Sequence, residues 1–180
     1  AGMAMLVTQI AAATAGVAWM LAEWFSGEKK PSLLGMCSGA VAGLVAITPA
    51  SGFVGPSGAF FIGLAAGVFC YLTCTKLKSA LGYDDSLDVF AVHGVGGILG
   101  TLLAGILATD TFGGLGIEKS AFDQTVVQFI GVISVAIFAL VVTIIIVKII
   151  QATIGLRVSS QQEEFDGLDL GSHGEKSYNL

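Results

Sequence analysis

Apolar residues are concentrated in five long runs, which polar or Gly- and Pro-rich segments separate. The runs cover residues of about 3–25, 33–48, 58–76, 87–108 and 125–150. A helix of about twenty apolar residues crosses the hydrocarbon core of a bilayer and satisfies its own backbone hydrogen bonds there. The pattern therefore predicts an all-α fold: a polytopic membrane helix bundle with five spans in residues 1–150, and a polar tail over residues 151–180.

Small residues mark one face of the second run and are scarce in the last. Gly35, Gly39 and Gly43 recur at every fourth position, and this spacing lets another backbone approach the helix closely. We expect a tight helix contact there. The last run is almost unbroken Val, Ile, Leu and Phe, so we expect it to face lipid. Because this run is longer than the hydrocarbon requires, it must tilt or project beyond the bilayer.

Composition supports a membrane protein and excludes other classes. Mean hydropathy is +0.86 and only 12% of residues are charged, whereas soluble domains contain about 25% charged residues. No basic patch or aromatic platform for nucleic acid is visible. The three cysteines lie in apolar runs with uneven spacing, which predicts neither a disulfide framework nor a zinc site. We expect no cofactor.

Cations are distributed very unevenly between the two sides of the membrane that the predicted spans would cross. Lys119 is on one side, and seven cations are on the other: Lys29, Lys30, Lys76, Lys78, Lys148, Arg157 and Lys176. Cytoplasmic loops of membrane proteins carry an excess of Lys and Arg. We therefore expect residues 26–30, residues 76–86 and the tail to be cytoplasmic, and the start of the chain to lie outside.

His93 is an ionisable residue inside the fourth apolar run. Such residues are costly at membrane depth unless they face a cavity or a partner, and they commonly mark a function. Gly96, Gly97 and Gly100 follow at helical spacing and are expected on its face. That face leaves room either for a narrow lumen or for the close approach of another backbone. The alternative is a packing histidine whose ring nitrogens a neighbouring helix satisfies. No acid, nucleophile or metal set stands beside His93, so we expect no enzyme.

Three acids, Asp84, Asp85 and Asp88, precede the His93 run. Carboxylates at a helix start can accept hydrogen bonds from its free N–H groups and stabilise its positive end. They could instead form an entrance that attracts cations. The sequence leaves both interpretations open.

The ammonium transporter family (Amt/Mep/Rh) has a tenth transmembrane helix that closely resembles Asp84-Asp85-Ser-Leu-Asp88-Val-Phe-Ala-Val-His93-Gly-Val-Gly-Gly. Its eighth helix resembles the run from Lys30 to Ala50. Its cytoplasmic tail resembles Gly155-Leu-Arg-Val, Glu163-Glu-Phe-Asp-Gly-Leu-Asp169 and Ser172-His-Gly-Glu175. The resemblance covers essentially the whole chain in order, is closer to the Amt branch than to Rh, and equates the five runs with helices seven to eleven.

The resemblance implies the second half of an inverted-repeat, eleven-helix channel that assembles as a homotrimer with one pore per subunit. It implies that His93 is one of two pore histidines, that Val89 lies at the cytoplasmic exit and that Thr48 lies toward the outer side. Val89 could instead be a packing residue, and the Thr48 hydroxyl could satisfy backbone freed by Pro49. Asp85, Asp88 and the glycines after His93 would be structural residues near the pore.

The family's function is passage of ammonium or ammonia across the cell membrane through a hydrophobic pore. The other histidine and the outer cation site would belong to an N-terminal part of the same transporter that this chain lacks, so we expect a fragment or a processed product. Two alternatives remain: an ammonium sensor that works with a separate signalling protein, and an inactive half that needs the N-terminal part.

The tail is acidic and polar, which is typical of a disordered, solvated end. The resemblance instead implies a cytoplasmic regulatory segment that packs on neighbouring subunits and responds to a PII signalling protein. The residues that carry this implication are Gly155, Arg157, Gly167, Asp169, His173 and Gly174. In this interpretation His173 belongs to the tail motif and is not a metal ligand, since a lone surface histidine is a poor metal site.

Overall fold

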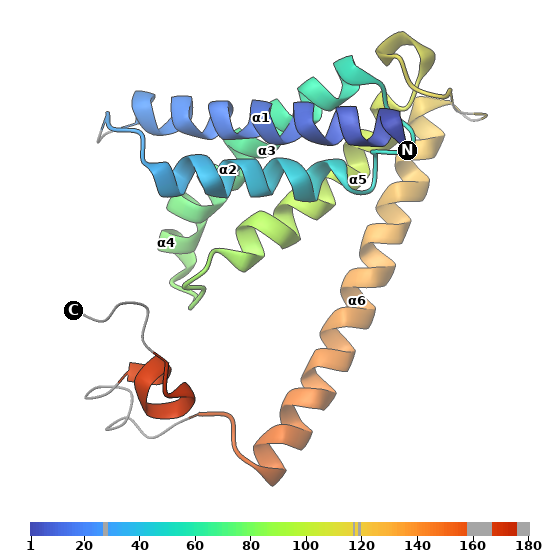
Figure 1. Ribbon diagram of the computed structural model, residues 1–180. Coiled ribbons are helices and arrows are strands. Elements are labelled where there is room, and N and C mark those ends of the chain that lie inside the picture. The colour runs from blue at the N-terminus through green and yellow to red at the C-terminus, as the bar shows by residue number, and fades with distance from the viewer. Residues whose placement is uncertain (27–28, 117, 119, 158–166, 176–180) are drawn as a thin grey trace. The chain divides into compact units, whose positions relative to one another are not determined.

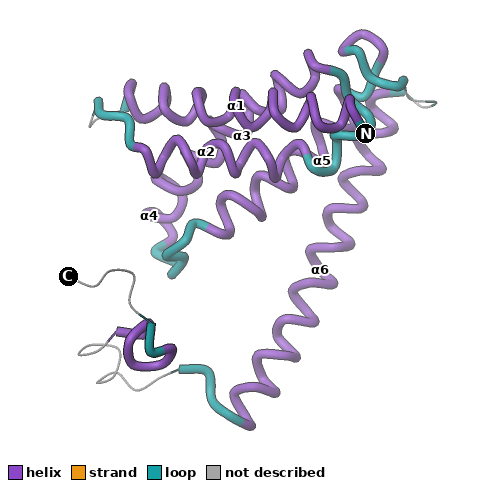
Figure 2. The backbone as a smooth tube through the Cα atoms, viewed as in Figure 1, coloured by secondary structure: helices purple, strands orange, loops and turns teal. Residues whose placement is uncertain are grey.

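The computed structural model describes residues 1–26, 29–116, 118, 120–157 and 167–175, and every regular element in this part is helical (Figure 1; Figure 2). The chain falls into two compact units, Ala1–Ser134 and Val135–Leu180. Lys119, Lys176 and residues 158–166 of the tail, on which parts of the sequence argument depend, lie outside the described residues.

Each of the five predicted spans corresponds to a helical segment. The segments are α1 (Gly2–Phe25), α2 (Leu33–Ile47), α3 (Pro56–Leu72) with the π turn η1 (Thr73–Leu77) and α4 (Lys78–Leu81), the π turn η2 (Phe90–Val95) with α5 (Gly96–Leu107), and α6 (Ala121–Thr153). Within the described residues, four stretches are long and apolar enough to cross a membrane: Gly2–Phe25, Pro56–Leu81, Phe90–Leu107 and Ala121–Thr153.

The second span is the shortest of the five, and its helix α2, with 15 residues, agrees with the predicted run 33–48. The sequence explains why this helix begins and ends where it does. Ser32 follows Pro31 and accepts a hydrogen bond from Gly35 N–H at 2.8 Å, which caps the start. At the other end Pro49 lacks an N–H and cannot continue the helix. At 1.5 Å per residue, α2 is about 23 Å long and falls short of the hydrocarbon thickness of about 30 Å.

Helices α1, α2 and α3 pack together through small residues, and α1 and α2 lie side by side (Figure 1). A Cβ added to Gly39 would lie 2.6 Å from Trp19 Cβ and 2.8 Å from the carbonyl oxygen of Ala15. A Cβ at Gly43 would overlap the backbone carbonyl of Ala11. The predicted close helix contact is therefore confirmed, and α1 is the helix that makes it.

Helix α6 contributes no buried residue to the described structure. Its 33 residues make it about 50 Å long, which exceeds the hydrocarbon thickness of about 30 Å. An apolar, largely exposed helix of this length is what the sequence predicts for a tilted or projecting helix that faces lipid.

The tail residues of the second unit form helix ends and turns. Gly155 has φ +82° and donates its N–H to Ile150 O at 3.0 Å, which ends α6 with a left-handed residue. The π turn η4 (Asp169–His173) ends in the same way at Gly174, whose φ is +65°. Gly167 is also left-handed, at φ +67°, and Arg157 and His173 are exposed. The regulatory role of this segment stays a prediction.

Candidate functional site

His93 lies in the π turn η2, at the start of an apolar stretch long enough to cross a membrane. Its side chain is exposed, and its ring has no hydrogen bond or ion pair with any residue that the structure describes. Single π turns inside α-helices occur frequently at functional sites. An imidazole at membrane depth is costly without a polar partner or a cavity, which makes His93 the candidate functional residue of this span.

The glycines after His93 are mainly contact residues. A Cβ at Gly96 would lie 3.4 Å from Cys70 Sγ, and one at Gly100 would overlap the Ala46 carbonyl of α2. Both glycines are buried, whereas His93 is exposed and Gly97 is intermediate. Gly96 and Gly100 thus differ from His93 in burial, and the expectation that they share one face with it stays a prediction. The π turn has more residues per turn than an α-helix and shifts the register of His93 relative to these glycines. Gly100 allows α5 to approach α2 closely, whereas a Cβ at Gly96 would make only ordinary van der Waals contact.

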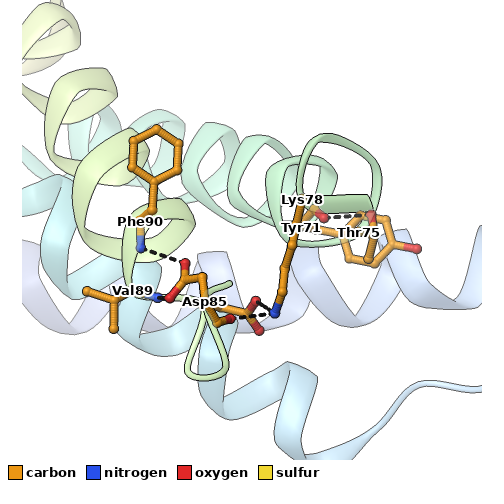
Figure 3. A network of polar contacts seen from close by, with 7 residues as sticks. Tyr71, Thr75, Lys78, Asp85, Val89 and Phe90 are labelled. Carbon is orange, nitrogen blue, oxygen red and sulfur yellow. Dashed lines mark hydrogen bonds and ion pairs between the residues drawn. The ribbon is translucent and has the colours of Figure 1, made fainter. Parts of the chain in front are cut away.

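Asp85 caps the start of the His93 helix (Figure 3). Its Oδ1 accepts a hydrogen bond from Val89 N–H and its Oδ2 accepts one from Phe90 N–H, both at 2.9 Å. Of the two interpretations of the acids, the capping role is therefore confirmed for Asp85. Val89 itself is half-exposed, and its predicted place at the pore exit remains a prediction.

Asp88 adopts φ +54°, a left-handed conformation that is uncommon outside glycine but that Asp tolerates. Its carboxylate forms an ion pair with Lys78 at 2.8 Å. Lys78 Nζ also donates a hydrogen bond to the backbone carbonyl of Asp85 at 2.5 Å (Figure 3). In the charge pattern of the sequence, Lys78 is only one of seven cations expected on the cytoplasmic side. The sequence feature that could have predicted this ion pair is the position of Lys78 ten residues before Asp88, with Gly82 between them as a residue that can turn the chain.

The turn between Lys78 and Asp88 is further held by Tyr83. Its ring packs edge-on against Phe90 with centroids 5.7 Å apart. Its hydroxyl is buried without a hydrogen-bond partner among the described residues. Loss of solvent raises the pKa of Tyr83 above its ordinary value, and the nearby Asp85 carboxylate adds to the shift. The phenol is therefore neutral at physiological pH.

Thr48 lies at the end of α2 and is exposed. Its hydroxyl donates a hydrogen bond to Leu44 O at 2.7 Å, while its N–H bonds to Val45 O at 3.2 Å. The hydroxyl thus replaces the backbone donor that Leu44 loses where the helix breaks before Pro49. This geometry supports the backbone role, and the pore role of Thr48 stays a prediction.

A cavity of about 430 Å³ adjoins Lys78 and Asp88 at the ends of α1, α2 and α3. Its polar wall includes Glu23, which accepts hydrogen bonds from Trp19 Nε1 at 3.2 Å and Ser32 N–H at 2.7 Å. A Cβ at Gly35 would overlap this carboxylate. Gly35 therefore makes room for Glu23, which joins the end of α1 to the start of α2.

Replacement of Asp85 tests the cap. Asp85→Ala removes the acceptor of two N–H groups and should lower the free energy of unfolding by about 1–2 kcal/mol. Asp85→Asn keeps one acceptor oxygen and should lose less. Thermal unfolding of the detergent-solubilised protein measures both, with Asp84→Ala as the control because Asp84 is exposed and has no hydrogen bond or ion pair with the described residues. Equal losses at positions 84 and 85 would contradict the cap.

The described residues are those of a multi-pass helical membrane protein with an ionisable residue in one of its spans. The family model described as the Ammonium Transporter Family matches residues 1–178. The chain belongs to this family.

Individual relatives agree with this assignment. The chain is 45% identical to the ammonium transporter of Aquifex aeolicus (strain VF5), over 100% of this chain and 42% of that protein. It superposes on the crystal structure of a Candida albicans Mep2 mutant with a TM-score of 0.80 and 32% identity, over 98% of this chain and 42% of that one. A solved sensor Amt protein gives a TM-score of 0.81 and 31% identity, over 91% of this chain and 40% of the other. The chain thus spans about two-fifths of the length of the relatives that it matches.

Proposed function

We propose that this chain is the C-terminal part of an ammonium transporter and that His93 lines the path of ammonium or ammonia across the cell membrane. The observation that carries the proposal is the exposed, unpaired imidazole in an apolar span of a chain that belongs to the ammonium transporter family. In the complete transporter the exposed side of His93 would face the N-terminal part, which would supply a second histidine.

Imidazole suits this role because its pKa lies near neutrality and each ring nitrogen can donate or accept a hydrogen bond. Two facing rings would form a polar path in an otherwise apolar tube, bind ammonia and relay a proton. A desolvated monovalent cation is very costly in such a tube. The same property would exclude sodium and potassium.

Further assignments follow from this proposal. Val89, one turn before His93, would lie at the cytoplasmic exit, and Thr48 would lie toward the outer side. The complete transporter would be a homotrimer in membrane lipid. The tail, with Arg157 and the turn that ends at Gly174, would be cytoplasmic and would respond to a PII signalling protein.

A fusion experiment tests the proposal. The chain is placed behind the N-terminal part of the Aquifex aeolicus relative that it does not match, and methylammonium uptake is measured in cells that lack ammonium transporters. The fusion is expected to restore uptake, whereas the chain alone at equal membrane level is not, because five helical segments with one pore histidine do not enclose the path. Uptake by the chain alone, or a fusion that folds in the membrane without uptake, would contradict the proposal.

A sensor is the second candidate, and the similarity to a sensor Amt protein favours it. The two functions differ in flux. A sensor would bind ammonium and change the state of a separate signalling protein, while a proteoliposome assay of the fusion would show no methylammonium flux.

A further inference from the structure

Lys78 connects two segments on either side of a chain reversal. It is the first residue of α4, directly after the π turn η1. Gly82, at φ +62°, donates its N–H to Lys78 O at 2.9 Å and turns the chain back toward the His93 helix. The Lys78 ammonium group then reaches the residues that begin that helix (Figure 3).

The contacts of Lys78 differ from those of an ordinary surface ion pair. Its ammonium group bonds both a carboxylate oxygen of Asp88 and a backbone carbonyl of Asp85. The two side chains of the ion pair are only 30% and 33% exposed, so solvent weakens their attraction less than at a fully exposed site. The carbonyl contact fixes the backbone of the residue whose own carboxylate caps Val89 and Phe90.

These bonds form a continuous path to His93. Lys78 holds Asp85 and Asp88, Asp85 holds the N–H groups of Val89 and Phe90, and η2 begins at Phe90 and contains His93. The π turns η1 and η2 also contact each other. π turns are rare, and the contacts of Asp85 and Asp88 lie directly before the π turn that carries His93. Asp88 itself has a left-handed backbone at φ +54°, which is uncommon for a residue other than glycine.

We propose that Lys78 is a positioning residue of the transport path: it sets the orientation of the π turn that carries His93 by holding Asp85 and Asp88. Lys78 does not contact the transported species in this proposal. The inference rests on the proposed transport function.

The test compares two lysines in the fusion described above. Lys78→Met keeps an unbranched side chain up to the ε position but removes the ammonium group. Lys76→Met is the matched control, since Lys76 is exposed and has no hydrogen bond or ion pair with the described residues. Because displacement of a functional group can cost up to about 100-fold in rate, we expect Lys78→Met to reduce the maximal methylammonium uptake per transporter about tenfold and to admit potassium. Lys76→Met should match the parent fusion.

Two further measurements separate positioning from general stability. Lys78→Arg can donate to the same two oxygens and should recover at least half of the parent's uptake per transporter. Uptake is divided by the amount of correctly assembled transporter in the membrane, so a variant that only folds poorly would show normal uptake per molecule and normal selectivity. That result, or equal effects of the Lys78 and Lys76 substitutions, would overturn the positioning role.

If the parent fusion itself has no uptake, the transport function fails and the Lys78 proposal fails with it. If the parent fusion takes up methylammonium, His93→Ala abolishes this uptake and Lys78→Met leaves it intact, only the Lys78 proposal is overturned.

Discussion

A transporter with His93→Ala is expected to lose selective methylammonium uptake, either by losing flux altogether or by becoming leaky to other cations. The substitution removes the ring that would hydrogen-bond ammonia and relay its proton, and it leaves a gap in an apolar span. Removal of a group that takes part in proton transfer typically costs about 10²–10⁴-fold in rate. Uptake of labelled methylammonium, together with potassium flux in the same proteoliposomes, measures both outcomes.

The chain provides an internal comparison for this experiment. Its other histidine, His173, is exposed at the end of η4 in the second unit. His173→Ala also removes one imidazole and should keep the selectivity of the parent. If His93→Ala leaves uptake and selectivity unchanged, His93 has no part in the path, and the proposed transport mechanism is wrong.

Gly100→Ala is expected to destabilise the helix bundle by up to about 2 kcal/mol, although it adds only one methyl group. The new Cβ would lie 2.6 Å from the carbonyl carbon of Ala46 and 2.7 Å from its Cα, besides overlapping the carbonyl oxygen. The obstacle is backbone, so relief requires α5 and α2 to move apart. Overpacking of this kind costs about 1–3 kcal/mol, partly offset by the better helix preference of Ala, about 1 kcal/mol. Thermal unfolding in detergent should show a clear loss of stability.

Gly131→Ala is the matched control for Gly100→Ala. Gly131 lies inside α6, and a Cβ there would meet nothing within 4 Å. The substitution then changes only the intrinsic helix preference, which favours Ala over Gly. The free energy of unfolding should therefore stay the same or rise by up to about 1 kcal/mol. A Gly100→Ala protein as stable as Gly131→Ala would show that α5 does not approach α2 as closely as described.

Much of the fold was predictable because it depends on residues close in sequence. Apolar runs long enough for a membrane helix predict the helical segments whatever surrounds them. The carboxylate of Asp85 lies four residues before the N–H group that it caps first, so the capping role follows from a local pattern. The spacing of Gly39 and Gly43 predicts a close helix contact, although it does not name α1 as the partner.

Other features required the tertiary structure. The composition of residues 90–95 is as apolar as that of an α-helix, and nothing in it indicates a π turn. In the structure His93 lies in this turn and is exposed, while Gly96 and Gly100 after it are buried. The partner of Gly100 is Ala46, more than fifty residues earlier, and periodicity within one helix carries no information about such distances.

Local patterns along the chain predict a multi-pass helical membrane protein that resembles the ammonium transporter family, with an ionisable residue in an apolar span and acids before it that either cap a helix start or attract cations. The three-dimensional arrangement was needed to find that Lys78 bonds Asp85 and Asp88 and that His93 is exposed. Hydropathy and capping act between neighbours along the chain, whereas the Lys78 contacts and the packing of α5 on α2 depend on how the chain turns between them.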